Sequence, residues 1–305
     1  MASYIKEELK KQGFLKFSIY KVPNLEKEKS NFKTWLDKGF HGKMKYLENN
    51  MQIRFQPDLI LEDTKTIITA LFNYYPEKKL PFTNNYRISK YAYGKDYHHV
   101  VKNKLNGIAE KAKNSFEDFN YRSFTDSAPL PDRLLAQKSG LGWIGKNTLL
   151  LNKEIGSFFF IGHLFLDIDL PADSFKIQED LCKDCDKCLK ACPTNALYEP
   201  YKMDPRKCLS YQTIENKDAE KDIPPQKFRG YIYGCDICQD VCPFNKNPIS
   251  HSTEESDPHP QLVQMTKNKW HELKPMEFGE IFRGSAVKRA GYKGLMQNIQ
   301  WLSKP

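Results

Sequence analysis

The residues of this chain best suited to chemistry are its eight cysteines, which all lie between Cys182 and Cys242. A disulfide framework is typical of short secreted chains whose cysteines are spread throughout their length. Here the first 181 residues and the last 63 contain no cysteine. The N-terminal residues 1–11 are rich in Lys and Glu and lack the apolar stretch of a signal peptide. This concentration of thiols therefore indicates metal binding.

The first cysteine group has the spacing Cys182-x2-Cys185-x2-Cys188-x3-Cys192 and is followed by a proline. Bacterial ferredoxins hold [4Fe–4S] clusters with this run, and its last cysteine ligates the second cluster of the pair. The first three thiolates therefore need a fourth ligand from elsewhere in the chain.

The second group, Cys235-x2-Cys238-x3-Cys242, matches the last three positions of the same run, and Ile232 stands at the first. Cys208 is the one cysteine left to complete the second set. The spacing thus predicts one cluster on Cys182, Cys185, Cys188 and Cys242, and another on Cys192, Cys208, Cys235 and Cys238. Two zinc sites are the alternative, because Cys-x2-Cys pairs also bind zinc. The three-step run and two Cys-Pro endings favour clusters.

Asp126 is the candidate for acid chemistry, because it follows a short predicted strand and opens a loop with two prolines. A carboxylic acid at such a place can donate a proton if an apolar neighbour raises its pKa. The alternative role is a turn or cap, which is common for Asp before Ser.

Three other polar segments are candidates for binding. Residues 140–148 contain three glycines that would let the backbone approach a flat or anionic group, although a glycine-rich turn is the alternative. Their spacing fits neither a Walker A loop nor a dinucleotide fingerprint. The run 91–99 mixes aromatics with His98 and His99, whose roles stay open, and Arg54 could clamp an anion or be solvated.

The elements that must position these residues can be read from the apolar pattern. Helical spacing predicts helices over 31–50, 96–119 and 131–139, the last ended by Gly140. Runs rich in apolar and β-branched residues predict strands at 66–72, 121–124 and 157–168. We therefore expect an α/β or α+β domain over residues 1–175, with Asp126 at the end of one strand.

Two further regions follow this domain. A ferredoxin-like module is expected over 176–248, with an insertion at 209–234 that lies close to the second cluster. Residues 249–305 form a linker and a short basic helical tail, in which positions 265–305 hold eight Lys or Arg against three acids. The whole chain carries 47 Lys plus Arg against 38 Asp plus Glu, for a net charge of +9. Such a balance suits a phosphate-rich partner, although a merely soluble basic surface is the alternative.

Composition excludes two broad classes. Hydrophobic residues make up 40% and charged residues 28% of the chain, which is typical of folded domains rather than disordered ones. No apolar run reaches transmembrane length. We expect a cytoplasmic protein that acts as a monomer without a membrane.

Taken in order, these segments resemble the epoxyqueuosine reductase family. The resemblance runs from about residue 30 to residue 296. It is carried by YAYGKDYH (91–98), TDSAPLPDR (125–133), GLGWIGKNT (140–148), both cysteine groups, CLSYQTIE (208–215) and FRGSAVKRAGYKG (282–294).

The resemblance implies a cobalamin-binding, reductive-dehalogenase-like domain fused to a module with two [4Fe–4S] clusters. It implies an oxidoreductase that removes the epoxide oxygen of epoxyqueuosine at the wobble position of tRNA and yields queuosine, with Asp126 as the proton donor. The cofactor contacts that it suggests are Arg54, Tyr93, Asp126, Lys146, Asn147, Thr148, Ser210, Tyr211 and Gln212. Lys288, Arg289 and Lys293 are the expected tRNA contacts.

The electron supply and the rival functions follow from the same features. An external donor such as a flavodoxin or ferredoxin system would feed the clusters. A cobalamin-dependent, dehalogenase-like reductase of a small molecule is the nearest alternative, but the basic tail would have no purpose there. A ferredoxin-type electron carrier leaves the first 180 residues unexplained. An iron–sulfur RNA-binding regulator would bind RNA without cobalamin.

Overall fold

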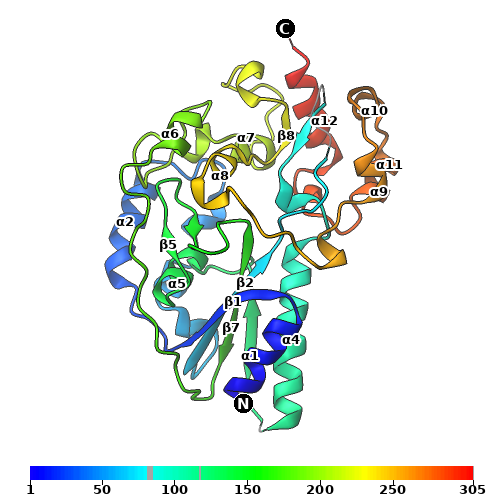
Figure 1. The fold of residues 1–305 in the computed structure, drawn as a ribbon. Helices are drawn as coiled ribbons and strands as arrows, with labels where there is room; N and C mark the ends of the chain where they lie inside the picture. Colours follow the sequence, from blue (N-terminus) through cyan, green and yellow to red (C-terminus); the bar gives the residue numbers. More distant parts are fainter. Residues whose placement is uncertain (81–84, 117, 305) are drawn as a thin grey trace.

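The computed structural model describes residues 1–80, 85–116 and 118–304 (Figure 1). Its centre is a four-stranded sheet in the order β1-β2-β7-β4. The strands are β1 (Phe14–Tyr20), β2 (Thr66–Asn73), β7 (Phe159–Leu166) and β4 (Tyr121–Phe124). All three pairings in this sheet are antiparallel, so the domain is an α+β arrangement rather than a parallel α/β sheet.

The predicted strands at 66–72, 121–124 and 157–168 are confirmed, with β7 slightly shorter than expected. Strand β2 is buried along its whole length because helices cover both faces of the sheet. Alternate residues therefore enter different cores: Ile68 packs with α1 (Ala2–Lys11) and α4 (Tyr97–Ser115), and Ile67 packs with α5 (Asp132–Lys138).

Two of the predicted helices are confirmed and one is wrong in its second half. Helix α4 begins after Asp96, whose carboxylate accepts a hydrogen bond from the His98 amide at 3.0 Å, and it ends at Ser115. The prediction extended this helix to residue 119, and residue 117 of that stretch lies outside the described residues. Helix α5 matches the prediction for 131–139.

The helix expected over 31–50 starts earlier and stops earlier, as α2 (Glu26–Asp37). Gly39 and Gly42 then adopt φ values of 64° and 57°, in the left-handed region that ends helices. A 3₁₀ turn (Lys45–Glu48) and the short α3 (Met51–Phe55) follow. The chain at 38–50 is therefore a folded loop that carries Tyr46. Arg54 follows it in α3.

The cysteine segments fold as short helices and turns. Helix α6 (Lys187–Ala191) lies in the first group and α8 (Ile237–Asp240) in the second. Between them, the insertion contains α7 (Leu209–Ile214) and β8 (Tyr231–Tyr233). Strand β8 pairs in parallel with β3 (Arg87–Ile88), so the second cysteine group is attached directly to the N-terminal region. The glycine run forms a hairpin of β5 (Trp143–Ile144) and β6 (Leu150–Leu151).

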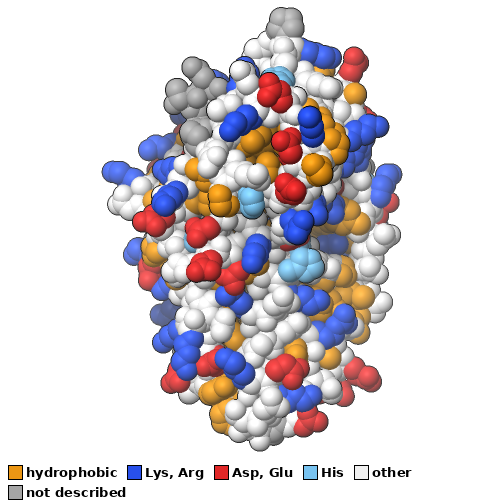
Figure 2. All heavy atoms as spheres, turned by 90° about the vertical axis from the view of Figure 1, so that its right-hand side faces the viewer, with side chains coloured by type: hydrophobic (Ala, Val, Ile, Leu, Met, Phe, Trp, Pro, Cys, Tyr) orange, Lys and Arg blue, Asp and Glu red, His pale blue; other side chains and the backbone are white. Residues whose placement is uncertain are grey.

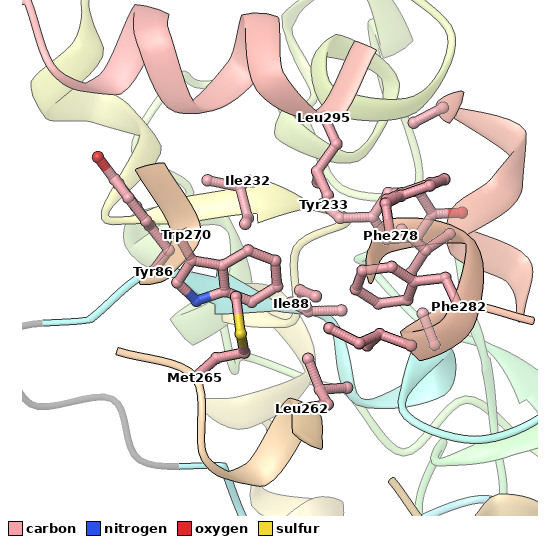
Figure 3. Packing of buried hydrophobic residues seen from close by; sticks show 14 of the residues in the cluster. Tyr86, Ile88, Ile232, Tyr233, Leu262, Met265, Trp270, Phe278, Phe282 and Leu295 are labelled. Atoms are coloured by element: carbon pink, nitrogen blue, oxygen red, sulfur yellow. The ribbon is translucent and has the colours of Figure 1, made fainter. Parts of the chain in front are cut away.

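The C-terminal tail is helical, as expected, and it does not stand apart. Its helices are α9 (Pro260–Val263), α10 (Lys267–Glu272), α11 (Pro275–Ile281) and α12 (Gly291–Leu302). One hydrophobic cluster joins the tail to β3 and β8, and Figure 3 shows Trp270, Phe278, Phe282 and Leu295 packed with Ile88, Ile232 and Tyr233. The division of the chain at 175 and 248 stays a prediction, and residue 305 at the end of the tail lies outside the described residues.

Over the described residues, no helix combines the length and apolar character needed to cross a membrane.

Candidate functional site

Strand β4 delivers Asp126 to the start of α4. The backbone of Asp126 has a φ of 48°, a left-handed conformation that Asp tolerates better than most residues. The Tyr97 hydroxyl donates a hydrogen bond of 2.6 Å to Asp126 Oδ2. Tyr97 is the first residue of α4, so one helix end and one strand end fix the position of this carboxyl.

Aromatic stacking holds the Tyr97 hydroxyl in place. The Tyr97 ring lies parallel to that of Phe160 on β7, with centroids 4.2 Å apart and planes 3° apart. The His98 ring stacks on it as well, at 4.0 Å. Such a stack restricts the Tyr97 ring and therefore the direction of its O–H.

His98 forms a second contact with the same carboxyl. Its Nδ1 lies 2.7 Å from Asp96 Oδ1, and its Nε2 lies 3.9 Å from Asp126 Oδ2. Burial lowers the pKa of His98, but the hydrogen bond to Asp96 and the charges of Asp96 and Asp126 outweigh it, so the pKa is raised overall. The open question of His98 and His99 is thus partly answered, because His98 faces Asp126 while His99 is exposed.

The environment of Asp126 favours its protonated form. Burial among protein atoms raises the pKa of this carboxyl, and the nearby charge of Asp132 raises it further. Tyr97, His98 and Arg133 oppose the rise. The side chain itself is 69% exposed, so solvent moderates the size of the shift. The acid is accessible to a ligand and yet is surrounded by protein.

Arg54 and Tyr46 reach the same neighbourhood from the loop after α2. Arg54 is 7% exposed, its guanidinium lies 5.0 Å from the Phe32 ring, and its Nε has no hydrogen-bond partner among the described residues. Tyr46 is 52% exposed, and the Arg289 guanidinium lies 5.6 Å from its ring. Burial raises the pKa of Tyr46, with a smaller contribution from Asp126.

The glycines of the run 140–148 serve internal packing rather than an open approach to a ligand. A Cβ on Gly142 would overlap the Leu151 carbonyl oxygen of the facing strand, and one on Gly140 would overlap the Phe175 ring. Lys146 Nζ donates to the Lys183 carbonyl, beside the first cysteine group. The Thr148 carbonyl accepts a hydrogen bond of 2.5 Å from the Arg133 guanidinium.

Of the remaining predicted cofactor contacts, Asn147 is the most suggestive, because its buried Nδ2 has no partner in the described part of the chain. In α7, the Tyr211 hydroxyl accepts a hydrogen bond of 2.9 Å from the Lys43 amide. The Gln212 side chain donates a hydrogen bond to the Arg206 carbonyl. Ser210 is half-buried beside them. Tyr93 packs in the hydrophobic cluster of the tail, and the run 91–99 reaches Asp126 through Tyr97 and His98 instead.

The eight cysteines are all free thiols. Burial raises the pKa of Cys242, and the thiols of Cys182 and Cys185 raise it further. Burial likewise raises the pKa of Cys238, and the thiols of Cys235, Cys208, Cys192 and Cys188 raise it further. These influences place Cys242 near Cys182 and Cys185, and Cys238 near thiols of both expected sets, so the division into two ligand sets stays a prediction.

The donor set fits iron–sulfur clusters. The Ala196 amide points at Cys192 Sγ over 3.3 Å, and backbone amides of Ser210 and Tyr211 oppose the rise in the pKa of Cys208. Amide donors to cysteine sulfur stabilise the reduced cluster and tune its potential. Within residues 1–80, 85–116 and 118–304, no three His, Cys, Asp or Glu side chains are grouped as a single metal ion requires.

The three predicted tRNA contacts are exposed on or beside α12, but they differ in their surroundings. Arg289 forms a two-pronged ion pair with Glu215, at 2.8 Å and 3.0 Å. Lys288 and Lys293 make no hydrogen bond or ion pair with any described residue. On the face that carries α4 and the helices α9–α11, basic and acidic side chains are interspersed (Figure 2).

Comparison with known proteins first defines the class. Residues 181–245 match the 4Fe-4S double cluster binding domain family, which covers both cysteine groups. Residues 54–127, from Arg54 to the loop of Asp126, match the epoxyqueuosine reductase QueG, DUF1730 family. The cysteine module is therefore a double-cluster iron–sulfur domain.

Full-length relatives then define the family. The chain is 44% identical to an epoxyqueuosine reductase of Cellulophaga algicola, over 98% of this chain and 96% of that one. It is 36% identical to the Escherichia coli enzyme of the same name, over 98% and 79%. A crystal structure of epoxyqueuosine reductase with an epoxyqueuosine-modified tRNA stem loop superposes with a TM-score of 0.89, at 28% identity, over 99% of this chain and 80% of that one. The chain belongs to the epoxyqueuosine reductase family.

Sequence reasoning did not assign roles to Tyr97, Asp132 or Tyr46. The start of α4 at Asp96 could have indicated that Tyr97 and His98 lie at a helix end. The contact of Tyr97 with Asp126 joins positions 29 apart in sequence and depends on the stack with Phe160. The position of Tyr46 depends on the loop that replaces the expected helix.

Proposed function

We propose that this chain carries out its family's reaction on tRNA with Asp126 as the proton donor beside a bound cobalamin. The observation that carries the proposal is the Asp126 carboxyl itself. It is accessible, it is held by the Tyr97 hydroxyl at 2.6 Å, and its surroundings raise its pKa, so it keeps a proton to a higher pH than an ordinary Asp.

The overall reaction fixes what the site must supply. Converting an epoxide to an alkene consumes two electrons and two protons and releases the oxygen as water. Asp126 would give a proton to the departing oxygen, where negative charge develops. His98, held by Asp96 and 3.9 Å from Asp126, is placed to return a proton to the acid after each turnover.

Two unsatisfied buried groups support a bound cofactor. Arg54 Nε and Asn147 Nδ2 are buried without a partner in the described residues, and buried polar groups in proteins are normally hydrogen-bonded. A cofactor with amide and phosphate groups would satisfy both. Bound cobalamin would supply a strongly reducing cobalt centre for the epoxide. Lys146, Thr148 and residues 210–212 remain candidate contacts.

The thiol environments suggest the direction of electron flow. Burial raises the pKa of Cys188 in the first set only to about 11, whereas it raises that of Cys238 in the second set much further. More protein atoms surround Cys238 than Cys188, although Cys188 exposes the smaller fraction of its surface. We propose that an external donor such as a flavodoxin or ferredoxin reduces the cluster on Cys182, Cys185, Cys188 and Cys242, and that the second cluster passes electrons inward.

The tRNA would bind through its phosphates on the basic tail. Lys288 and Lys293 are the better candidates for phosphate contacts, because both are exposed and unpaired within the described part of the chain. Arg289 already pairs with Glu215, so its charge is largely compensated. The exposed Tyr46 offers an aromatic face on which a splayed base of the anticodon loop can stack. We propose a monomer as the acting form.

The test is Asp126→Asn in protein loaded with both clusters and cobalamin. We expect the turnover of epoxyqueuosine tRNA to fall by about 10²–10⁴-fold, the usual contribution of a positioned acid. Iron content and cobalamin binding should stay unchanged. Asp118→Asn is the matched control, because Asp118 is an exposed acid paired with Lys113. Turnover of Asp126→Asn at the normal rate, with cofactors bound, would refute the role of Asp126.

A further inference from the structure

A buried lysine joins the second cysteine group to the segment that precedes α4. Lys90 opens a 3₁₀ turn, and Asp236 and Asp240 lie at the two ends of α8. Lys90 Nζ lies 3.3 Å from Asp236 Oδ2 and 2.6 Å from Asp240 Oδ1. The side chains of Lys90 and Asp236 are 4% and 2% exposed, and that of Asp240 is 45% exposed. An ammonium group is therefore enclosed beside the second cysteine group.

Several contacts hold this ammonium group in one place. Besides the Lys90 ammonium, the Asp236 carboxylate accepts hydrogen bonds from the Ser89 hydroxyl and, at 2.8 Å, from the Lys90 amide. Lys90 Nζ also lies 5.2 Å from the centre of the Phe158 ring. Burial lowers the pKa of Lys90, but the charges and hydrogen bonds of Asp236 and Asp240 outweigh it, so the pKa is raised overall. Lys90 therefore keeps its positive charge.

The chain itself places this charge near two cluster ligands. Asp236 directly follows Cys235, and Asp240 comes two residues after Cys238. Consecutive Cα atoms are only about 3.8 Å apart, so the acids that hold Lys90 lie within one or two residues of these thiols. Gln239 of the same helix donates a hydrogen bond of 3.0 Å to the Ser157 carbonyl, which fixes α8 against the chain that enters β7.

Stability alone does not explain a lysine at this position. Taking charges out of water is costly, and replacing a buried ion pair by apolar residues of similar volume is often neutral or stabilising. A charge enclosed by protein is, however, weakly screened, so it acts strongly on any neighbouring group whose charge changes. Each reduction of an iron–sulfur cluster adds one negative charge, and local net charge is among the factors that set its potential.

We propose that Lys90 raises the reduction potential of the cluster bound by Cys235 and Cys238, because its ammonium offsets the two acids that flank these ligands. On the proposed route, a higher potential favours electron transfer from the first cluster to the second. Lys90 is not a catalytic residue in this scheme, since it acts through its charge. The inference rests on the predicted ligand set but not on the role of Asp126.

The test compares Lys90→Met, Lys90→Arg, Asp240→Asn and the double variant Lys90→Met/Asp240→Asn, each in the full chain loaded with both clusters. Redox titration followed by electron paramagnetic resonance measures the potential of each cluster without cobalamin or tRNA. The titration is made at about pH 8.5, far above the ordinary pKa of a carboxyl. Loss of its signal in Cys208→Ser identifies the second cluster, and iron analysis shows whether both clusters are in place.

Lys111→Gln is the matched control. Lys111 also pairs with a buried acid, Glu8, at 2.9 Å. This pair joins α4 to α1, which lies well away from α8 (Figure 1). The control therefore removes one lysine from a paired acid without changing the charge near the cysteines.

We expect Lys90→Met to make reduction of the second cluster about tenfold less favourable, which for one electron is a fall of about 59 mV. Asp240→Asn should shift the same potential in the opposite direction, because it removes a negative charge. The double variant should lie near the parent, since the two effects offset each other. Lys90→Arg, which keeps the charge, and Lys111→Gln should both leave the potential unchanged.

The sign of each shift separates an effect of charge from a structural one. Unshifted potentials in Lys90→Met and Asp240→Asn, or shifts of the same sign in both, would overturn the inference. If Lys90→Met fails to hold its clusters, Asp240→Asn decides alone, because only a rise in potential agrees with the proposal. A chain that did not reduce epoxyqueuosine tRNA would still show these shifts, so failure of the proposed function is distinguishable.

Discussion

Asp126 obtains its properties from contacts that come from three separate elements. Its backbone leaves β4 in a left-handed conformation, Tyr97 and His98 approach from α4, and Asp132 acts from α5. Each contact either fixes the carboxyl or changes its charge. The acid can therefore be tested one partner at a time.

The Tyr97 hydrogen bond is the first partner to test. This bond favours the ionised form of Asp126, so Tyr97→Phe should raise the pKa of the acid further. A donor that keeps its proton to higher pH shifts the basic limb of the pH–rate profile upward. Loss of one positioning hydrogen bond, worth about 1 kcal/mol, should also slow turnover several-fold.

The measurement is the pH profile of turnover for Tyr97→Phe and the parent chain. The Phe ring preserves the stack on Phe160, so the position of α4 should not change. A profile that keeps its basic limb at the original pH would contradict the role of this hydrogen bond.

Among single residues, the sequence pointed to the cysteines and to Asp126, but it did not indicate which side chains contact Asp126. Cysteine spacing predicted both ligand sets, because cluster geometry restricts the distance between ligands along the chain. Asp126 could be proposed from its place after a strand. Asp132 and His163 could not be paired, because their contact depends on how β7 lies beneath α5.

Among the elements, the β5–β6 hairpin shows why glycine is needed at Gly142. A Cβ at this position would overlap the Leu151 carbonyl oxygen. Gly142→Ala should therefore force the two strands apart and destabilise the protein by about 1–3 kcal/mol. Chemical denaturation of the cluster-loaded protein measures this difference.

Gly279→Ala is the matched control for that measurement. Gly279 lies inside α11, and a Cβ there meets no atom within 4 Å. Alanine favours the helix, so this variant should be stabilised by up to about 1 kcal/mol. Equal effects of the two substitutions would contradict the packing argument for Gly142.

The elements also show the limit of periodicity. Strands β2 and β7 were predictable because most of their residues are apolar, as expected of strands that lie in the core. The helix expected at 31–50 was wrong because Gly39 and Gly42 end it, and the apolar residues beyond serve a loop. Apolar spacing alone cannot separate a continued helix from a loop that packs on the same core.

For the whole molecule, we predict that Cys208 is the ligand that joins distant parts of the chain into one cluster site. Cys208→Ser should remove the second cluster, so the iron content should fall from about eight to about four atoms per chain. Ser210→Ala, two residues away, should leave the iron content unchanged. Iron analysis and electron paramagnetic resonance of both variants measure this, and a full iron content in Cys208→Ser would contradict the assigned ligand set.

The basic tail gives a second prediction for the whole molecule. Replacing Lys288 and Lys293 together by Gln should weaken tRNA binding and reduce the slope of log affinity against log salt by about 1–2. Lys190→Gln is the control, because Lys190 is an exposed base paired with Asp186. Binding measured at several salt concentrations decides between specific phosphate contacts and a general basic surface, since an unchanged slope would exclude these two residues.

The composition predicted a basic helical tail, but not where it packs. Trp270, Phe282 and Leu295 join the tail to β3 and β8 in one hydrophobic cluster. The contacts with β3 connect residues about 200 positions apart, and no local pattern specifies them. The tail therefore contributes to the stability of the segment that precedes Cys235, as well as to the basic surface.

The most direct measurement is anaerobic turnover of tRNA that carries epoxyqueuosine. The cluster-loaded protein would be supplied with a chemical reductant, with and without cobalamin, and the digested tRNA analysed by nucleoside mass spectrometry. Our account predicts loss of one oxygen atom, giving queuosine, only when cobalamin is present. Unchanged epoxyqueuosine, from protein shown to hold both clusters and cobalamin, would contradict it.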